Sequence, residues 1–116
     1  MNIDAAISAH SKWKHRLKAY IDGTSTEKLS CSVVEKDDQC DLGRWLKSPE
    51  AKALGTKASE LAPQHAQFHR CAADVVRAVD RGAKAEAEAK LTMGSEFSRV
   101  SAKLVTLLSA LRSVVG

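Results

Sequence analysis

The sequence has few aromatic residues and few prolines, and both shortages bear on the fold class. Aromatic residues make up 4% of the 116 residues, and there are two prolines. Strand-forming runs separated by regularly spaced turn residues, which are typical of β-sandwiches and barrels, do not occur. Hydrophobic residues account for 44% of the chain and charged residues for 28%, which is ordinary for a globular protein. This composition favours helices packed through aliphatic side chains.

Long apolar runs and a leader-like start are also lacking. No apolar run approaches the roughly 18 to 20 residues needed to span a bilayer, so we expect no membrane insertion. The first ten residues, MNIDAAISAH, have neither the basic start nor the apolar block of a signal peptide. Three cysteines are an odd number, which argues against a disulfide framework. We therefore expect a cytoplasmic protein with free thiols.

The charge of the chain excludes little by itself. The formal net charge is +4, and lysine and arginine are spread along the sequence without forming blocks. No nucleic-acid-binding motif is present, and aromatic residues are too few to stack the bases of a single strand. We expect solvated helix surfaces and no nucleic-acid partner.

Three long segments have the hydrophobic spacing of helices that face a core. The first begins near Ile3 and ends at Gly23, and the second begins near Leu61 and closes at Gly82. The third is expected to run from about Ala83 to Val114 as one helix, since a single glycine is weak evidence of a kink.

Shorter helices are predicted between the first two long ones. One covers QCDLGRWL, with Asp37 or Asp38 as its N-cap, and Ser48 caps the start of another that has Pro49 in its first turn. The prediction is an all-α fold, a four-helix bundle with a short extra helix that carries a cysteine. The length of the chain suggests a single domain over residues 1–116.

Three histidines occupy positions where aliphatic residues are expected. His10 lies in the inner stripe of the first helix, and His65 and His69 are four residues apart in HAQFHRC. One buried histidine usually has an ordinary hydrogen-bond partner. Three buried imidazoles need more polar partners than an aliphatic core provides. The shorter central helices come between the two helices that carry these histidines, so the two are the first and third helices of an up-down bundle and run parallel. The three rings are then expected at a similar level along the bundle axis. This arrangement predicts a metal site.

Cys40 is the expected fourth ligand, because one thiolate and three imidazoles suit a tetrahedral Zn²⁺ ion. Cys31 lies in a stretch without a clear pattern. Cys71 is about 200° around the helix from His69, so we expect it to be a small buried hydrophobic residue. His15 is off the inner stripe and is expected at the surface.

Three segments, HSKWKHRL, CDLGRWL and HAQFH, resemble the signature blocks of the chemoreceptor zinc-binding domain, and the likeness runs from near residue 3 to about residue 111. The resemblance implies one zinc ion bound by His10, Cys40, His65 and His69 inside a four-helix bundle. Members of that family usually sit at the C-terminal end of cytoplasmic bacterial chemoreceptors or diguanylate cyclases, often as homodimers.

Other positions of the family pattern match as well, and we expect them to pack around the site. They are Trp13, Leu42, Gly43, Trp45 and Phe68. The sequence contains no signalling coiled coil and no cyclase module. We therefore expect a signalling module attached in cis or supplied in trans by another chain.

The resemblance implies a sensory domain that responds to zinc, or to oxidants through the zinc-bound Cys40. Its output would be chemotaxis or cyclic di-GMP signalling. Coordination deprotonates the thiol, and oxidation of Cys40 would remove a ligand. The alternative is a structural zinc site in a dimerisation module that senses nothing. We expect the segment from residue 30 to residue 55 to move, and Asp37, Asp38 and Asp41 are candidates to orient the imidazoles.

A zinc-dependent enzyme is the third possibility, and the sequence argues against it. Metalloproteases place a glutamate directly after the first histidine, whereas Ala66 follows His65 here. Four protein ligands also leave no open position for a catalytic water. The Glu-x-x-His pairs of di-iron bundles are absent. We expect a protein that is not an enzyme and has no catalytic residues.

Overall fold

Long helices dominate the computed structural model, which describes residues 3–24, 28–36, 41–92 and 94–115. Within those ranges the chain forms helices and no strands, so the prediction of an all-α fold is confirmed. In chain order the helices are α1 (Ile3–Asp22), α2 (Cys31–Val34), α3 (Asp41–Leu46), α4 (Pro49–Ala53), α5 (Thr56–Ser59), α6 (Leu61–Asp80), α7 (Lys84–Leu91) and α8 (Glu96–Val115).

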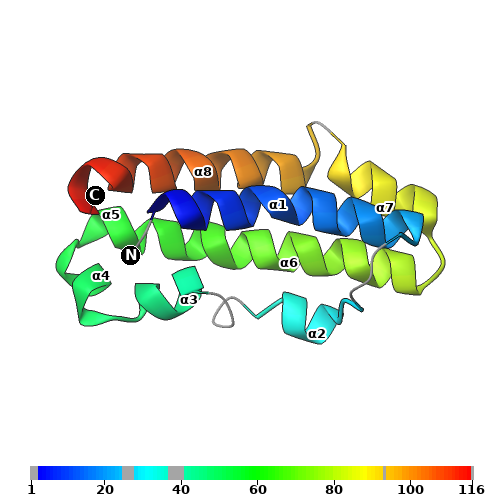
Figure 1. Ribbon diagram of the computed structural model, residues 1–116, viewed down its shortest axis with the longest axis horizontal. Coiled ribbons are helices and arrows are strands. Elements are labelled where there is room, and N and C mark those ends of the chain that lie inside the picture. The colour runs from blue at the N-terminus through cyan, green and yellow to red at the C-terminus, as the bar shows by residue number, and fades with distance from the viewer. Residues whose placement is uncertain (1–2, 25–27, 37–40, 93, 116) are drawn as a thin grey trace.

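Three helices of 20 residues each form the body of the bundle. Figure 1 shows α1 and α6 running side by side in the same direction, with α8 returning antiparallel to both. The short α7 lies at the end of the bundle where α1 and α6 finish, and it packs against both. The short helices α2 and α3 cover the outer side of α6. The predicted bundle is therefore present, and the two helices that carry the histidines, α1 and α6, are parallel as predicted, with several short helices along the remaining side.

Glycine and serine set helix boundaries where the sequence predicted them. Gly23 and Gly82 follow α1 and α6 with φ of 75° and 78°, a left-handed conformation that helices adopt where they stop. Ser48 precedes α4, and its hydroxyl oxygen accepts a hydrogen bond from the Ala51 amide at 3.3 Å. Pro49 is the first helical residue, where its missing N–H costs nothing.

The prediction of one continuous helix from Ala83 to Val114 is wrong. Helix α7 ends at Leu91, and α8 begins at Glu96. Thr92 between them is extended, with φ −69° and ψ 158°, and Gly94 has φ 87°. Ser95 then caps the new helix, because its hydroxyl oxygen accepts from the Ser98 amide at 3.2 Å. The left-handed Gly94 and the N-cap Ser95 thus act together and interrupt the helix despite the helical periodicity.

The core is mostly aliphatic, and within it Phe68 of α6 packs against Phe97 of α8. The three long helices each bury one face against the others, and this fixes their rotation about their own axes. Among the described residues, no helix combines the length and the apolar character needed to cross a bilayer.

Candidate metal centre

Three histidine side chains converge inside the bundle. His10 comes from α1, and His65 and His69 come from successive turns of α6. Their exposed fractions are 3%, 0% and 3%, so the cluster is shielded from solvent. One ligand atom of each residue lies within 4.8 Å of the others. The parallel packing of α1 and α6 therefore brings together the three imidazoles that the sequence singled out.

The spacing of the rings suits a small divalent cation. The ring centroids of His65 and His69 are 4.6 Å apart, and that of His10 lies 5.1 Å from His65 and 6.0 Å from His69. The Nε2 atoms of His65 and His69 are 3.1 Å apart. Two nitrogens bound tetrahedrally to zinc at about 2.0–2.1 Å would lie roughly 3.3 Å apart. The pair needs almost no rearrangement to share one ion.

Backbone carbonyls hold two of the imidazoles in the orientation that metal binding requires. The Nδ1–H of His10 donates to the Ala6 carbonyl at 2.8 Å, and the Nδ1–H of His69 donates to the Val34 carbonyl at 2.9 Å. A neutral imidazole that donates from Nδ1 carries its lone pair on Nε2. The Nε2 of His10 is buried and has no hydrogen-bond partner among the described residues. A metal ion is the partner that such an atom fits.

Burial keeps the rings of His10 and His65 uncharged. It lowers the pKa of His10, and it lowers the pKa of His65 to about 3, with the neighbouring imidazoles adding to both shifts. Neutral imidazole is the form that ligates metals, so at physiological pH protons compete little for these nitrogens.

Aromatic rings enclose the cluster. Phe68 is fully buried and lies edge-on to His10 and His69, with ring centroids 5.2 and 5.8 Å away. Trp13 is half-buried, with its ring 6.3 Å from that of His69, and its outer face is covered by the guanidinium of Arg16 at 3.9 Å. These rings form part of the cover that leaves the histidines at most 3% exposed.

The other residues of the family pattern lie on α3. Leu42 and Trp45 belong to the hydrophobic core, with 1% and 9% exposure, and Gly43 between them is also buried. Helix α3 is therefore anchored to the bundle by its apolar side.

The predicted fourth ligand, Cys40, lies outside the described residues, as do Asp37 and Asp38 and the side chain of Asp41. Its assignment as a ligand, and theirs as orienting carboxylates, stay predictions. Helix α3 begins at Asp41, the residue directly after Cys40, and packs against α6, the helix that carries His65 and His69.

The remaining cysteines and the fourth histidine lie outside the cluster. Cys71 is buried, and burial together with the nearby Glu96 and Asp74 carboxylates raises the pKa of its thiol to about 11. It is the inert small residue that the sequence predicted. Cys31 begins α2 and is half-buried, and His15 is exposed on α1.

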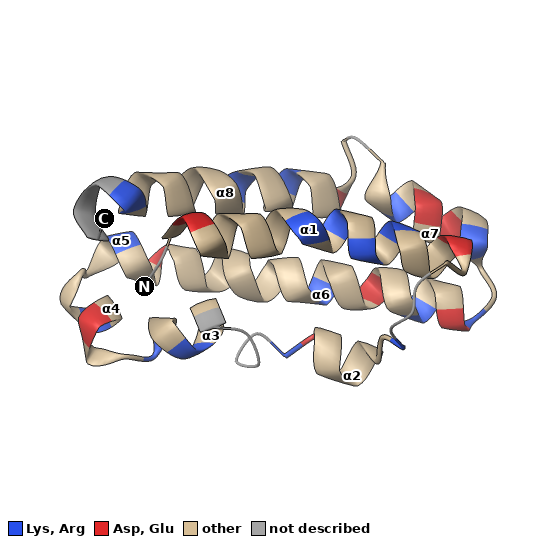
Figure 2. Cartoon of the chain, in the orientation of Figure 1, with Lys and Arg blue, Asp and Glu red and all other residues tan. Residues whose placement is uncertain are grey.

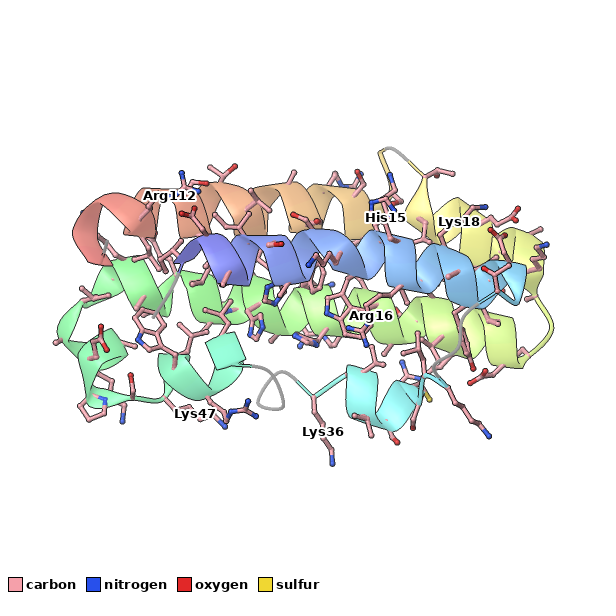
Figure 3. All side chains as sticks on the ribbon, in the orientation of Figure 1. His15, Arg16, Lys18, Lys36, Lys47 and Arg112 are labelled. Carbon is pink, nitrogen blue, oxygen red and sulfur yellow. The ribbon has the colours of Figure 1, made fainter. Side chains whose placement is uncertain are left out.

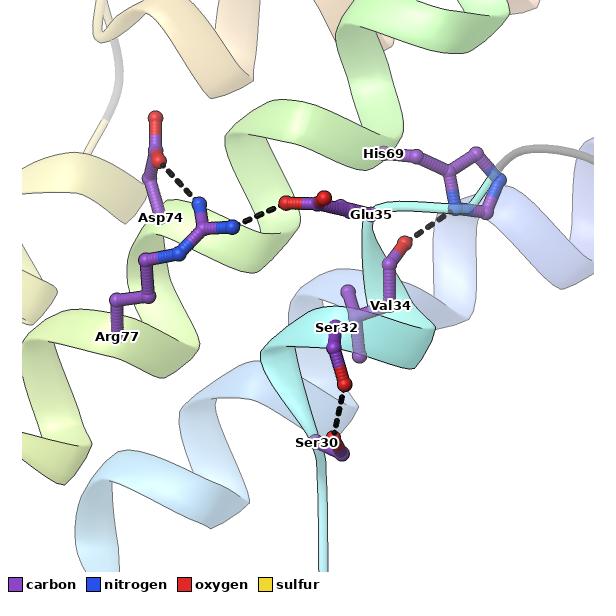
Figure 4. Close-up of polar contacts among 7 residues, drawn as sticks. All are labelled: Ser30, Ser32, Val34, Glu35, His69, Asp74 and Arg77. Atoms are coloured by element: carbon purple, nitrogen blue, oxygen red, sulfur yellow. Dashed lines mark hydrogen bonds and ion pairs between the residues drawn. The ribbon is translucent and has the colours of Figure 1, made fainter.

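The sequence did not reveal the part played by α2. The carbonyl of its last residue, Val34, accepts the hydrogen bond of His69, as Figure 4 shows. The next residue, Glu35, forms an ion pair with Arg77 of α6, which also binds Asp74 at 3.0 Å. The adjacent valines Val33 and Val34 were the only local signal, and a turn-rich surrounding sequence obscured it.

Comparison with protein families matches residues 10–76 to the model of the chemoreceptor zinc-binding domain. The match covers more than half of the chain, and it contains all three clustered histidines and Cys40. Searches of curated proteins and of solved structures found no match. Since the matching family binds zinc, Zn²⁺ is the ion that the cluster fits. The chain belongs to the chemoreceptor zinc-binding domain family.

Proposed function

We propose that the chain is a sensory domain that binds one zinc ion through His10, Cys40, His65 and His69 and controls a chemoreceptor or diguanylate cyclase signalling module. The observation that carries the proposal is the convergence of three buried imidazoles from two parallel helices. A cluster of this kind is costly to bury without a ligand, because its polar nitrogens have left water.

The chemistry of the donor set favours sensing over a permanent structural role. Structural zinc sites commonly use two or more thiolates, whereas the proposed site has one. With less negative charge around the ion, the site is expected to bind and release zinc within a regulatory range. Bound zinc would keep Cys40 as a thiolate, and an oxidant that transfers oxygen to this sulfur would remove a ligand.

The segment from residue 30 to residue 55 is the element we expect to respond. Its described part contains the short helices α2, α3 and α4, of four to six residues each. Helices this short have little stability of their own, so α2 and α3 depend on contacts with α6. Both Val34, which holds His69, and Cys40 belong to this segment, so loss of the ion would weaken its attachment.

We propose binding without catalysis. The histidines are at most 3% exposed, so a substrate would have no direct approach to them. In the part of the chain that the structure describes, the cluster that can hold a metal contains histidines alone, with no carboxylate to act as a general base. A screen for hydrolysis by the zinc-loaded chain is expected to give no turnover.

Metal analysis of the purified chain and its variants tests the ligand set. We expect about one zinc per chain, and at least about tenfold weaker zinc binding in Cys40→Ala and in His65→Ala. The exposed His15→Ala is the matched control and should bind zinc like the parent chain. Unchanged zinc affinity in Cys40→Ala would show that the Cys40 thiolate is not a zinc ligand.

A second measurement separates a sensor from a structural dimerisation module. Zinc affinity is measured by competition with a chelator, before and after treatment with hypochlorous acid. A sensor exchanges zinc with the chelator or releases it on oxidation of Cys40. A metal that survives both treatments would instead indicate a structural site. Sedimentation of the zinc-loaded chain tests the homodimer that we expect from the family.

A further inference from the structure

A groove between α1 and α2 leads from the surface of the molecule to the histidine cluster. Its volume is about 460 Å³, and we call it the α1–α2 groove. Its lining includes Ala9 and Trp13 of α1, Val34 of α2, and His69 of the cluster. The His69 side chain is only 3% exposed, so the groove opens onto a ring that is otherwise covered. An ion that passes here does not require the long helices α1 and α6 to separate.

The charged side chains of the α1–α2 groove are at its rim. Figure 2 shows basic residues along α1 and on both sides of α2. Those that line the groove are Arg16, Lys28 and Lys36, and none of them is buried. Figure 3 shows Lys36 projecting away from the bundle. The buried part of the lining is formed by Leu29, Val34 and His69. The cations at the rim do not attract Zn²⁺, and the groove can serve as a path because of where it leads.

His69 is the histidine of the cluster that has room to turn outward. Its Nδ1–H donates to the Val34 carbonyl of the short helix α2 at 2.9 Å. The Nδ1–H of His10, by contrast, donates to the Ala6 carbonyl within the 20-residue helix α1. A helix of four residues has little stability of its own, so the bond from His69 is the more easily broken of the two. An imidazole ring takes roughly the space of three waters, on the order of 90 Å³. The groove is large enough to receive it.

Trp13 adjoins His69 on the wall of the groove. The centroids of the two rings are 6.3 Å apart and their planes are at 77°, which is the edge-to-face contact of an aromatic pair. The Arg16 guanidinium lies 3.9 Å from the centroid of the Trp13 ring, and this cation–π contact favours the observed position of the indole. An outward turn of the His69 ring therefore requires the indole of Trp13 to shift.

We propose that zinc enters and leaves the histidine cluster through the α1–α2 groove, where His69 turns outward and Trp13 sets the rate. This inference rests on the proposed function, because it concerns how the same site takes up and releases its ion. A side chain that obstructs a path raises the barrier in both directions. It therefore changes the rates of uptake and release by the same factor and leaves the affinity unchanged.

Stopped-flow measurement of zinc exchange tests the path. Release is followed at several concentrations of a chelator and extrapolated to none, and uptake is followed with a zinc-sensitive dye. Trp13→Ala should speed both rates by about tenfold, and Trp13→Phe, which keeps an aromatic ring, by less than about threefold. Ala9→Leu narrows the groove and should slow both rates by about threefold or more. Ala85→Leu places the same side chain at an exposed position of α7 and should change neither rate.

The ratio of the two rates separates an obstructing side chain from one that stabilises the bound ion. In each folded variant, checked by circular dichroism, this ratio should stay within about threefold of that of the parent chain. Faster release with unchanged uptake in Trp13→Ala would overturn the proposal, because the indole would then only stabilise the bound state. Unchanged rates in Trp13→Ala or in Ala9→Leu, or an equal effect of Ala85→Leu, would also overturn it, while zinc binding and the proposed function would stand. A parent chain that binds no zinc would overturn both.

Discussion

At the scale of residues, the histidine cluster is maintained by hydrogen bonds that set tautomers. His10 and His69 each donate from Nδ1 to a backbone carbonyl, of Ala6 and Val34 respectively. Each ring is thereby left with its Nε2 lone pair directed to the interior. Backbone carbonyls serve here in the role that the sequence led us to expect of Asp37, Asp38 or Asp41, whose side chains are not described.

The buried His65 makes the metal-free chain sensitive to acid. Its pKa is about 3 in the folded chain and about 6.5 when unfolded, so only the unfolded state takes up the proton as pH falls through 6.5. We expect its contribution to the free energy of unfolding to fall by about 1.4 kcal/mol per pH unit between about pH 6 and pH 5. Urea unfolding of the chelator-treated chain at several pH values measures this slope.

The matched variants for the acid experiment are His65→Leu and His15→Gln. The first removes the buried titrating ring, so its free energy of unfolding should depend less steeply on pH. The second alters an exposed histidine and should leave the slope unchanged. Identical slopes in the parent chain and in His65→Leu would contradict the lowered pKa of His65.

Phe68 should be more important for stability than any polar contact around the site. It is fully buried and contacts His10, His69 and Phe97. Phe68→Ala is expected to lower the free energy of unfolding by about 3–5 kcal/mol, because it leaves a cavity between α1, α6 and α8. Val33→Ala, at an exposed aliphatic position, should change it by less than about 0.5 kcal/mol. Denaturant titration of the zinc-loaded chains compares them, and a loss below about 1 kcal/mol for Phe68→Ala would contradict this packing.

At the scale of elements, the short helices differ in kind from the long ones. The segment with α2, α3 and α4 is held to α6 by the His69–Val34 hydrogen bond, the Glu35–Arg77 ion pair and the apolar side of α3. The ion pair joins exposed side chains and contributes little. Loss of the His69–Val34 hydrogen bond or of the apolar contacts of α3 would therefore weaken the attachment of this segment most.

Hydrogen exchange with and without zinc tests this view of the short helices. Amides between residues 30 and 55 should exchange faster when zinc is removed, because this segment loses its attachment at Cys40 and His69. Amides in the middle of α8 serve as the internal control and should change much less. Equal protection of the segment in both states would refute its role as the moving element.

The break between α7 and α8 can be tested at Gly94. Its φ of 87° is strained for residues with a Cβ atom, although a Cβ added there would meet no atom within 4 Å. We expect Gly94→Ala to lower the free energy of unfolding by about 1–2 kcal/mol through backbone strain alone. Thermal unfolding measures the change. A stabilised Gly94→Ala variant would indicate that the chain can continue as one helix.

At the scale of the whole molecule, helical periodicity predicted the architecture well. The inner stripes of α1 and α6 coincide with their buried residues because each helix must hide one apolar face. The same reasoning placed His10, His65 and His69 together, since parallel helices with histidines near corresponding heights bring them into contact. The meeting of the three histidines was predictable because they lie on long, regular helices.

Local structure without periodicity was less predictable. Helix α2 has four residues, too few for a period, and its contact with His69 joins positions 35 residues apart. The break between the end of α7 at Leu91 and the start of α8 at Glu96 was missed because the apolar positions continue on both sides of it. In both places tertiary contacts and backbone conformation determine the structure, and a hydrophobic pattern predicts neither.

The central claim is that three imidazoles and one thiolate share a single ion. X-ray absorption at the zinc edge of the loaded chain measures this most directly. We predict four-coordinate zinc with three nitrogen ligands at about 2.0 Å and one sulfur at about 2.3 Å. Replacement of Cys40 by alanine should abolish the sulfur shell. A spectrum of the parent chain without sulfur, or with six oxygen or nitrogen ligands, would contradict the account.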